Sequence, residues 1–266
     1  MNFYKYESLG NDFILLDLLG KVEKVTQQKI NSNDWSETTQ KLCNKNFGIG
    51  ANGILILKKE KSIIKSLIFN ADGSDGGVCF NGIRCIAKHL FDFHNFPKEF
   101  NVVMGNKKIQ CKINEEITTN VGKAKYVQTK KIKIKNKFYS GHMVDVGNPH
   151  FIIFKKTNQQ WLCENGNLFE NHKTFKNKTN TEFIWQHENK KTFNALVYER
   201  GCGITQACGS GAAAIIQTLL KTKQIKLNEK IKIQMLGGTL EIWTDKKETI
   251  FQKANAHLIF EGNLKI

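Results

Sequence analysis

The sequence has no apolar run of about 18 or more residues, the length that a membrane-spanning helix requires. Its first residues, MNFYKYESLGNDF, also lack the basic and then apolar layout of a signal peptide. Only two prolines occur, and no low-complexity tract or Pro/Gly-rich linker divides the chain. We therefore expect a cytoplasmic protein without a membrane partner, in which 266 residues form one large domain or two small ones.

Cysteine patterns typical of disulfide scaffolds and zinc sites are missing as well. The chain has an odd number of cysteines, seven, and no Cys-x-x-Cys pair; they are residues 43, 79, 85, 111, 163, 202 and 208. In a chain of this size such a pattern argues against a disulfide framework and against a structural metal. We expect reduced thiols and no metal site, with Cys43, Cys111 and Cys163 buried and inert.

Arginine is scarce although the chain is basic. The net charge is +16, yet only Arg84 and Arg200 among the 40 basic residues are arginine. The lysines are spread along the chain rather than gathered in a patch, so we do not expect nucleic-acid binding, although a basic binding protein stays an alternative. Where lysine fills almost every cationic position, the two arginines can mark sites that need a planar, bidentate donor.

What the sequence does contain is mainly strand-like segments in which apolar and polar residues alternate. These segments are residues 14–19, 53–57, 66–70, 100–104, 107–113, 131–135, 142–146, 150–154, 193–198, 230–235, 239–244 and 257–261. Helical patterns are fewer and cover residues 36–46, 81–93 and 211–221. The last of these is apolar almost all round, which indicates a buried helix wrapped by sheet.

The order strands, helix, strands occurs twice along the chain. It predicts an α+β (α/β) fold with two pseudo-symmetric halves, each a curved, mostly antiparallel or mixed sheet around a central helix. We expect the N-terminal half to span residues 1–117, with a C-terminal strand, residues 256–266, returning to it. The C-terminal half would then span residues 118–255, and the active site would lie in the cleft between the halves.

Two cysteines, Cys79 and Cys208, each precede one of the central helices and are followed by small or amide residues. Backbone N–H groups at a helix N-terminus can hold a carboxylate, and the same position lowers the pKa of a thiol. Two such thiols can remove a proton from one face of a carbon and return one to the other. The pair therefore predicts a racemase or epimerase that needs no cofactor.

Five motifs along the chain resemble, in order, those of the diaminopimelate epimerase family. They are Gly10-Asn11-Asp12-Phe13; Asn70-Ala71-Asp72-Gly73-Ser74 with Cys79 and Asn81-Gly82-Ile83-Arg84-Cys85; Gly147-Asn148-Pro149-His150; Thr179-Asn180-Thr181-Glu182-Phe183, read as a short loop; and Glu199-Arg200-Gly201 with Ala207-Cys208-Gly209-Ser210-Gly211. Each motif alone is a weak signal, but five in the family's order are a strong one.

The resemblance implies an isomerase of two pseudo-symmetric halves, commonly a homodimer, that interconverts LL- and meso-diaminopimelate without cofactor or metal in lysine and cell-wall precursor biosynthesis. It implies that Cys79 and Cys208 are the catalytic acid and base, and that His150 and Glu199 support their protonation. The backbone at Phe80-Asn81 and Gly209-Ser210 would hold the reacting carboxylate. The residues implied for the far end of the substrate are Asn11, Asn70, Asn148, Asn180, Glu199 and Arg200.

The sequence departs from the family's usual pattern at a few positions. Phe80 stands where glycine usually follows the first cysteine, Ile204 where an acidic residue is common, and Gly53 leaves no side chain for a glutamine contact known in some members. A racemase or epimerase of another amino acid on the same fold therefore stays an alternative. The polar set implied for the far end argues against a small apolar substrate.

Overall fold

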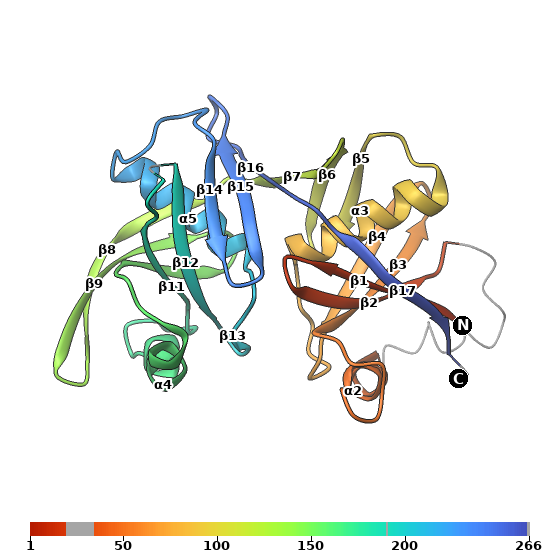
Figure 1. Cartoon of the computed structure of the whole chain (residues 1–266), viewed down its shortest axis with the longest axis horizontal. Helices are drawn as coiled ribbons and strands as arrows, with labels where there is room; N and C mark the ends of the chain where they lie inside the picture. Colours follow the sequence, from red (N-terminus) through yellow and green to blue (C-terminus); the bar gives the residue numbers. More distant parts are fainter. Residues whose placement is uncertain (20–34, 190, 265–266) are drawn as a thin grey trace. The chain divides into compact units, whose positions relative to one another are not determined.

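The computed structural model describes residues 1–19, 35–189 and 191–264 of the chain. These residues divide into two compact units. Unit 1 comprises Met1–Thr119 with Asn255–Ile266, and unit 2 comprises Asn120–Ala254. The chain therefore leaves unit 1 once, completes unit 2, and returns to unit 1 with its last strand (Figure 1).

Unit 1 is a mixed sheet with a long helix. Its elements are β1 Asn2–Ser8, β2 Asn11–Asp17, α2 Trp35–Cys43, β3 Gly53–Glu60, β4 Ile63–Asn70, α3 Phe80–His94, β5 Glu99–Met104, β6 Lys107–Ile113, β7 Ile117–Gly122 and β17 His257–Asn263. The strands pair in the order β17-β1-β2-β3-β4-β5-β6-β7. The pairs β2–β3 and β4–β5 are parallel, and the others are antiparallel.

Unit 2 repeats this plan. Its elements are β8 Lys125–Ile134, β9 Lys137–Asp145, β10 Pro149–Phe154, α4 Gln159–Glu170, β11 Asn180–Gln186, β12 Thr192–Glu199, β13 Gly203–Ile204, α5 Gly209–Lys221, β14 Ile231–Met235, β15 Gly238–Thr244 and β16 Ile250–Ala254. The order is β8-β9-β10-β11-β12-β14-β15-β16, with β10–β11 and β12–β14 parallel. The short strand β13 pairs with β12 in addition.

The two units are therefore equivalent strand by strand, with β17 of unit 1 in the place of β8 in unit 2. In each unit the long helix comes after the fifth strand in this order. It lies in the connection between the second pair of parallel strands, β4 and β5 in unit 1 and β12 and β14 in unit 2. Helix α3 packs against β1, β2, β3, β5, β6 and β17, and α5 against β8, β9, β10, β11 and β15. Contacts with strands from across the sheet show that each sheet wraps its helix (Figure 1), which confirms the predicted fold class.

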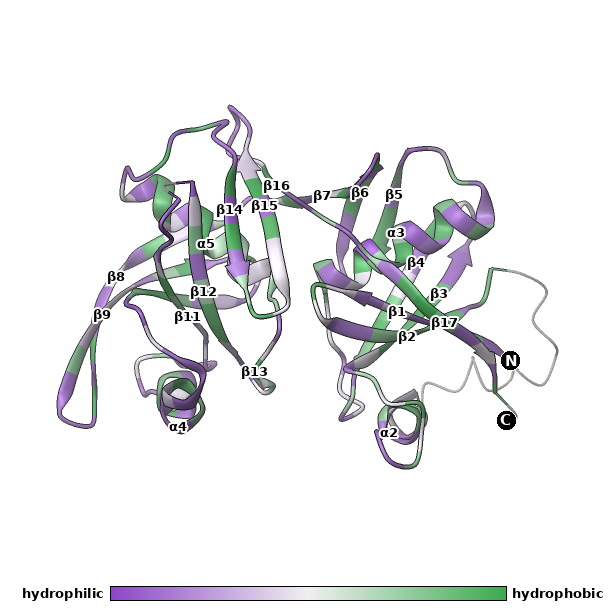
Figure 2. Cartoon of the chain, viewed as in Figure 1, coloured by the Kyte–Doolittle hydropathy of each residue, from purple (hydrophilic) through white to green (hydrophobic). Residues whose placement is uncertain are grey.

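The apolar patterns of both helices were read correctly. The α3 stripe, Ile83, Ile86, Ala87 and Leu90, is fully buried, and so is most of α5. The edge strand β17 is different, because its apolar middle, Leu258, Ile259 and Phe260, is partly exposed (Figure 2). No helix among the described residues is long and apolar enough to cross a membrane.

Some elements were missed from the sequence. Helix α4 has a weak apolar pattern, with Asn165, Gly166 and Asn167 in its middle, and no helix was expected there. The segment Thr179–Phe183, read as a loop, is mostly strand β11. Its side chains are buried from Asn180 to Ile184, so the alternation that marks a half-buried strand is absent.

Candidate active site

The two helix N-termini carry the cysteines in the same backbone geometry. Cys79 is the N-cap of α3, with φ −124° and ψ 113°, and Cys208 is the N-cap of α5, with φ −122° and ψ 112°. Each cysteine's carbonyl accepts the first intrahelical hydrogen bond, from Ile83 at 2.9 Å and from Ala212 at 3.0 Å. The N–H groups in the first turn of a helix have no backbone acceptor within the helix, and such groups commonly bind anions. In α5 the Gly211 N–H donates to Cys208 Sγ.

Glycine at the third position after the cysteine lets each helix approach its sheet closely. A Cβ on Gly82 would lie 2.8 Å from Cδ2 of Leu55, and one on Gly211 would lie 2.7 Å from Oε1 of Glu182. Leu55 on β3 and Glu182 on β11 are therefore equivalent neighbours of the two helices. The unit 1 position is apolar, whereas the unit 2 position carries a carboxylate.

A buried polar group lies beneath the N-terminus of α5. His150 on β10 and Glu182 on β11 form a hydrogen-bonded pair with 2.6 Å between Nδ1 and Oε1, and neither side chain is exposed. The other ring nitrogen of His150, Nε2, lies 3.1 Å from Oδ1 of Asn148. His150 and Asn148 are among the site residues expected from the sequence, whereas Glu182 is not, because the segment that carries it was expected to be a loop and is strand β11.

The environment of Cys208 corrects one expectation. The helix N-terminus was expected to lower the pKa of both thiols, but the pKa of Cys208 is raised well above its ordinary value. Burial is the main cause, and the negative charges of Glu199 and Glu182 add to it; hydrogen bonds from Gly211 N–H to Sγ, 3.3 Å, and with Ser210 oppose it. Cys208 is consequently a protonated thiol at neutral pH.

Glu199 stands at the end of β12 beside this thiol. Burial raises the pKa of Glu199, while hydrogen bonds from Thr205 and Cys208 and the positive charge of His150 lower it. The Thr205 hydroxyl donates to Oε1 of Glu199. Glu199 is therefore within hydrogen-bonding reach of the Cys208 thiol, and the supporting role expected from the sequence stays a prediction.

Asn180 and Arg200 extend the unit 2 group from the ends of β11 and β12. Asn180 donates from Nδ2 to the Pro149 carbonyl at 2.8 Å and accepts the Arg200 N–H at 3.0 Å. The exposed Arg200 guanidinium donates one bond, from Nη1 to the Asn177 carbonyl, 3.1 Å. It forms no described ion pair with Glu199. Gly209, also in this group, accepts from Gln252 at 2.9 Å.

The unit 1 residues expected at the site also lie at strand ends and at the start of α3. Asn11 is the buried first residue of β2, and Asn70, the last residue of β4, donates to Ser74 at 3.0 Å. Asn81 is buried and accepts from Arg84. Arg84 is fully buried and donates from Nε to Ser8 Oγ at 2.9 Å, so its guanidinium bonds within unit 1.

Phe80 is buried, and the cysteines other than Cys79 and Cys208 differ in their burial. The Phe80 ring is 3% exposed, with the Lys107 ammonium 5.9 Å from its centroid. All seven cysteines, which lie within the described ranges, are thiols. Cys43 and Cys111 are buried as expected, but Cys163 is exposed, because it lies on a solvent-facing position of the helix that was not predicted.

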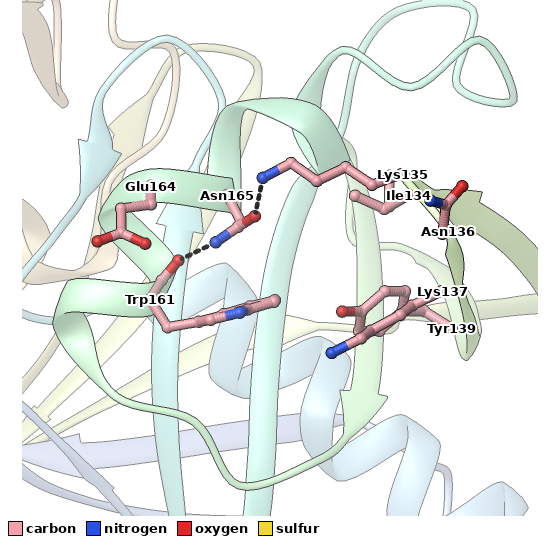
Figure 3. A pocket seen from close by; sticks show the side chains of 8 residues that line it. All are labelled: Ile134, Lys135, Asn136, Lys137, Tyr139, Trp161, Glu164 and Asn165. Atoms are coloured by element: carbon pink, nitrogen blue, oxygen red, sulfur yellow. Dashed lines mark hydrogen bonds between the residues drawn. The ribbon is translucent and has the colours of Figure 1, made fainter.

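Each unit has one further feature that does not involve its N-cap cysteine: a histidine–aspartate group in unit 1 and a pocket in unit 2. At the C-terminal end of α3, His89 and His94 both contact Oδ2 of Asp17, at 3.2 and 2.6 Å. Their donor types would suit a divalent cation, but hydrogen bonds within the group already account for the arrangement. In unit 2, a pocket of about 360 Å³ lies between the β8–β9 turn and α4, and no residue predicted for the site lines it (Figure 3).

Comparison with known sequences identifies the family. The sequence profile described as diaminopimelate epimerase matches residues 3–127 and 142–259. The chain is 31% identical over 294 residues to a diaminopimelate epimerase of Prochlorococcus marinus (strain NATL1A), covering 100% of this chain and 99% of the relative. It is also 31% identical over 289 residues to that of Elusimicrobium minutum (strain Pei191), covering 100% of both.

Solved structures share the fold at much lower identity. A probable proline racemase from Agrobacterium radiobacter K84 matches with a TM-score of 0.74 at 8% identity, over 100% of this chain and 93% of that one. A hydroxyproline epimerase from Agrobacterium vitis matches with a TM-score of 0.73 at 9% identity, over 98% and 91%. At such identities the likeness shows the fold alone.

Proposed function

The chain belongs to the diaminopimelate epimerase family, a family of isomerases, and on that premise we propose that it converts LL-2,6-diaminopimelate to meso-diaminopimelate by moving an α-proton between two thiols. The observation that carries the proposal is the matched pair of cysteine N-caps, Cys79 and Cys208, on equivalent helices. The product would serve lysine and peptidoglycan precursor synthesis. A cytoplasmic homodimer stays a prediction.

The reaction needs stabilisation of the charge that develops when the Cα–H bond breaks. One cysteine, as a thiolate, takes the proton and becomes a thiol, while the electron pair moves into the carboxylate as an enolate. The other cysteine gives its proton to the opposite face and becomes the thiolate. Backbone N–H groups at Phe80-Asn81 and Gly209-Ser210 would hold the reacting carboxylate, since those positions form the first turns of the two helices.

The surroundings of Cys208 decide its resting protonation state: its pKa is raised, so it is the resting acid. We therefore assign to Cys79 the role of the base that attacks LL-diaminopimelate. The reverse direction requires Cys208 to lose its proton, and Glu199 beside it can accept hydrogen bonds from the thiol. Proton exchange through Glu199 would thus prepare Cys208 for the return reaction.

The far end of the substrate carries a second carboxylate and ammonium group. Arg200, exposed and with one described donor bond, can bind the carboxylate through its remaining N–H groups. Asn11, Asn70, Asn148 and Asn180 offer amide donors and acceptors for the ammonium group and the carboxylate. Such a polar set suits a substrate with two amino acid ends better than proline or hydroxyproline.

Proton NMR in D2O tests the proposal directly. Purified, reduced protein given LL-diaminopimelate should introduce deuterium at one α-carbon while meso-diaminopimelate forms. The variants Cys79→Ser and Cys208→Ser should each lose epimerisation, whereas the matched control Cys163→Ser should keep it, because Cys163 is exposed on α4. Epimerisation that persists in either active-site variant rules out the two-thiol mechanism. Exchange on proline with none on diaminopimelate favours the alternative substrate.

A further inference from the structure

The buried pair His150–Glu182 has no counterpart in unit 1. Phe13 on β2 pairs with Gly53, two residues before Leu55, just as His150 on β10 pairs with Asn180, two residues before Glu182. Phe13 and Leu55 therefore occupy in unit 1 the positions of His150 and Glu182 in unit 2. The same position in the fold can be filled with apolar side chains, which are 4% and 0% exposed.

Packing alone does not explain why unit 2 carries charge at this position. Burying the carboxylate of Glu182 costs several kcal/mol of desolvation, which its hydrogen bonds recover only in good geometry. The second carboxylate oxygen of Glu182, Oε2, is buried and accepts no hydrogen bond within the described part of the chain. An apolar pair would avoid that cost, so the charges indicate a role other than stability.

The chemistry of the pair determines which ring nitrogen of His150 carries a hydrogen. A carboxylate can only accept hydrogen bonds, so Nδ1 of His150, 2.6 Å from Glu182, must carry a hydrogen. In this neutral ring Nε2 is an acceptor, so the Asn148 amide, whose Oδ1 is placed 3.1 Å away, must be turned to donate from Nδ2 to Nε2. Asn148 lies among the residues proposed to bind substrate. Without Glu182 the ring could adopt the other tautomer or turn over, and Asn148 would lose a defined partner.

The position of Glu182 links this group to the thiol. Its Oε1 lies 2.7 Å, and Cys208 Cβ 3.3 Å, from the place a Cβ on Gly211 would occupy. We propose that Glu182 is a positioning residue that holds His150 with its Nδ1 proton, and so aims Nε2 and Asn148 toward the substrate beside Cys208. The role rests on the function proposed above, and it explains the buried charge.

The state of the His150 ring can be measured without any turnover. In a ¹⁵N-labelled full-length protein, long-range ¹H–¹⁵N spectra, assigned with His150→Phe, report which ring nitrogens carry hydrogen. We expect a protonated Nδ1 in the wild type and a mixture of tautomers in Glu182→Gln, whose amide can donate as well as accept. A wild-type ring protonated only at Nε2 overturns the proposal, whether or not Glu182→Gln folds.

Kinetics provide the second readout. Glu182→Gln keeps the side-chain volume and should lower kcat by roughly 10- to 100-fold, the range seen when outer partners of metal-bound histidines are removed, with a smaller change in KM. Glu182→Asp, which keeps the charge, should recover part of the rate. A kcat within twofold of wild type in Glu182→Gln overturns the positioning role and leaves the proposed function intact.

The apolar arrangement of unit 1 supplies the folding control. The double variant His150→Phe/Glu182→Leu copies Phe13 and Leu55 and should unfold in urea at or above the wild-type midpoint, while being at least as impaired in kcat as Glu182→Gln. A double variant that is stable but impaired in kcat would show that the pair positions groups for catalysis and is not needed for stability. If the double variant retains wild-type kcat, Glu182 has no part in catalysis. A wild type that shows no deuterium exchange refutes the proposed function, while its tautomer still tests Glu182.

Discussion

At the scale of single residues, the two cysteines share a backbone geometry but differ in their neighbours. Cys208 lies among the carboxylates of Glu199 and Glu182, and its pKa is raised by burial first and by these charges second. In unit 1, the buried guanidinium of Arg84 lies near Cys79. Burial lowers the pKa of Arg84 to about 10. The unlike charges suit a resting acid on unit 2 and a resting base on unit 1.

Removing the charge of Glu199 should make Cys208 more acidic. In Glu199→Gln, the Cys208 thiol should react faster with iodoacetamide at neutral pH, because a larger fraction is thiolate. Peptide-resolved mass spectrometry gives the rate for each cysteine over a pH series. The exposed Cys163 serves as the internal control and should react equally in both proteins. An unchanged Cys208 rate would mean that Glu199 does not control its protonation.

The sequence revealed these cysteines because each has a glycine three residues on and is followed by an apolar helical run, a local signal. It could not reveal Glu182 or the raised pKa of Cys208. Both depend on β10, β11 and the start of α5 coming together from distant parts of the chain. A single glutamate within the short segment Thr179–Phe183 has no periodic signal, and its partner His150 lies 32 residues away.

At the scale of elements, the glycines Gly82 and Gly211 determine how closely each helix approaches its sheet. Alanine at residue 82 would press on a Leu55 methyl group, which can shift, and should cost about 1–3 kcal/mol of unfolding free energy. Alanine at residue 211 would displace the Glu182 carboxylate from His150 and should cost about 3–5 kcal/mol. Urea unfolding measures both, and equal costs would show that the buried pair is not disturbed.

The C-terminal end of α3 is anchored by Asp17. Burial would raise the pKa of this carboxyl, but hydrogen bonds from His89, Leu19 and His94 outweigh it and lower the pKa to about 2. A carboxyl whose pKa is lower in the fold stabilises it above its unfolded pKa, near 4, and loses that contribution as pH falls toward 2. The contribution at neutral pH is about 2 kcal/mol.

The variant Asp17→Asn tests this anchor. Its unfolding free energy should be lower than that of wild type at neutral pH, and should change less between about pH 4 and pH 2. Urea titrations at several pH values, followed by circular dichroism, measure the difference. The surface variant Glu115→Gln is a useful control, because its exposed side chain lies in the bend between β6 and β7. Parallel pH curves for wild type and Asp17→Asn would exclude the anchor.

At the scale of the whole molecule, the units differ in how their first strand is supplied. In unit 2, β8 precedes β9 directly, through the turn Lys135-Asn136. In unit 1, the equivalent strand β17 comes from the far end of the chain and pairs with β1 from Asn2↔Asn263 to Glu7↔His257. The return of the last strand was predicted from the order strands, helix, strands, which occurs twice along the chain. The strand-by-strand equivalence of the two units could not be predicted, because β1, β7, β11 and β16 were not recognised as strands.

Unit 1 should therefore fold alone only when β17 is supplied. A fragment of residues 1–122 lacks that strand, exposes the edge of β1, and removes the Asn255 carbonyl that binds Ser8 at 2.7 Å. A permuted fragment, residues 255–264 joined to 1–122 by a short glycine linker, restores both. The linker is feasible because the Met1 amino group and the Leu264 carbonyl are 2.8 Å apart.

We expect the permuted fragment to be monomeric, with cooperative urea unfolding by circular dichroism, and the fragment 1–122 to aggregate or unfold without cooperativity. Unit 2 as residues 120–254 is continuous and should fold without permutation. Equal stability of the two unit 1 fragments would contradict the assignment of β17 as its edge strand. Neither unit alone should exchange an α-proton with inversion, because each supplies one thiol of the pair and inversion needs an acid and a base on opposite faces of the carbon.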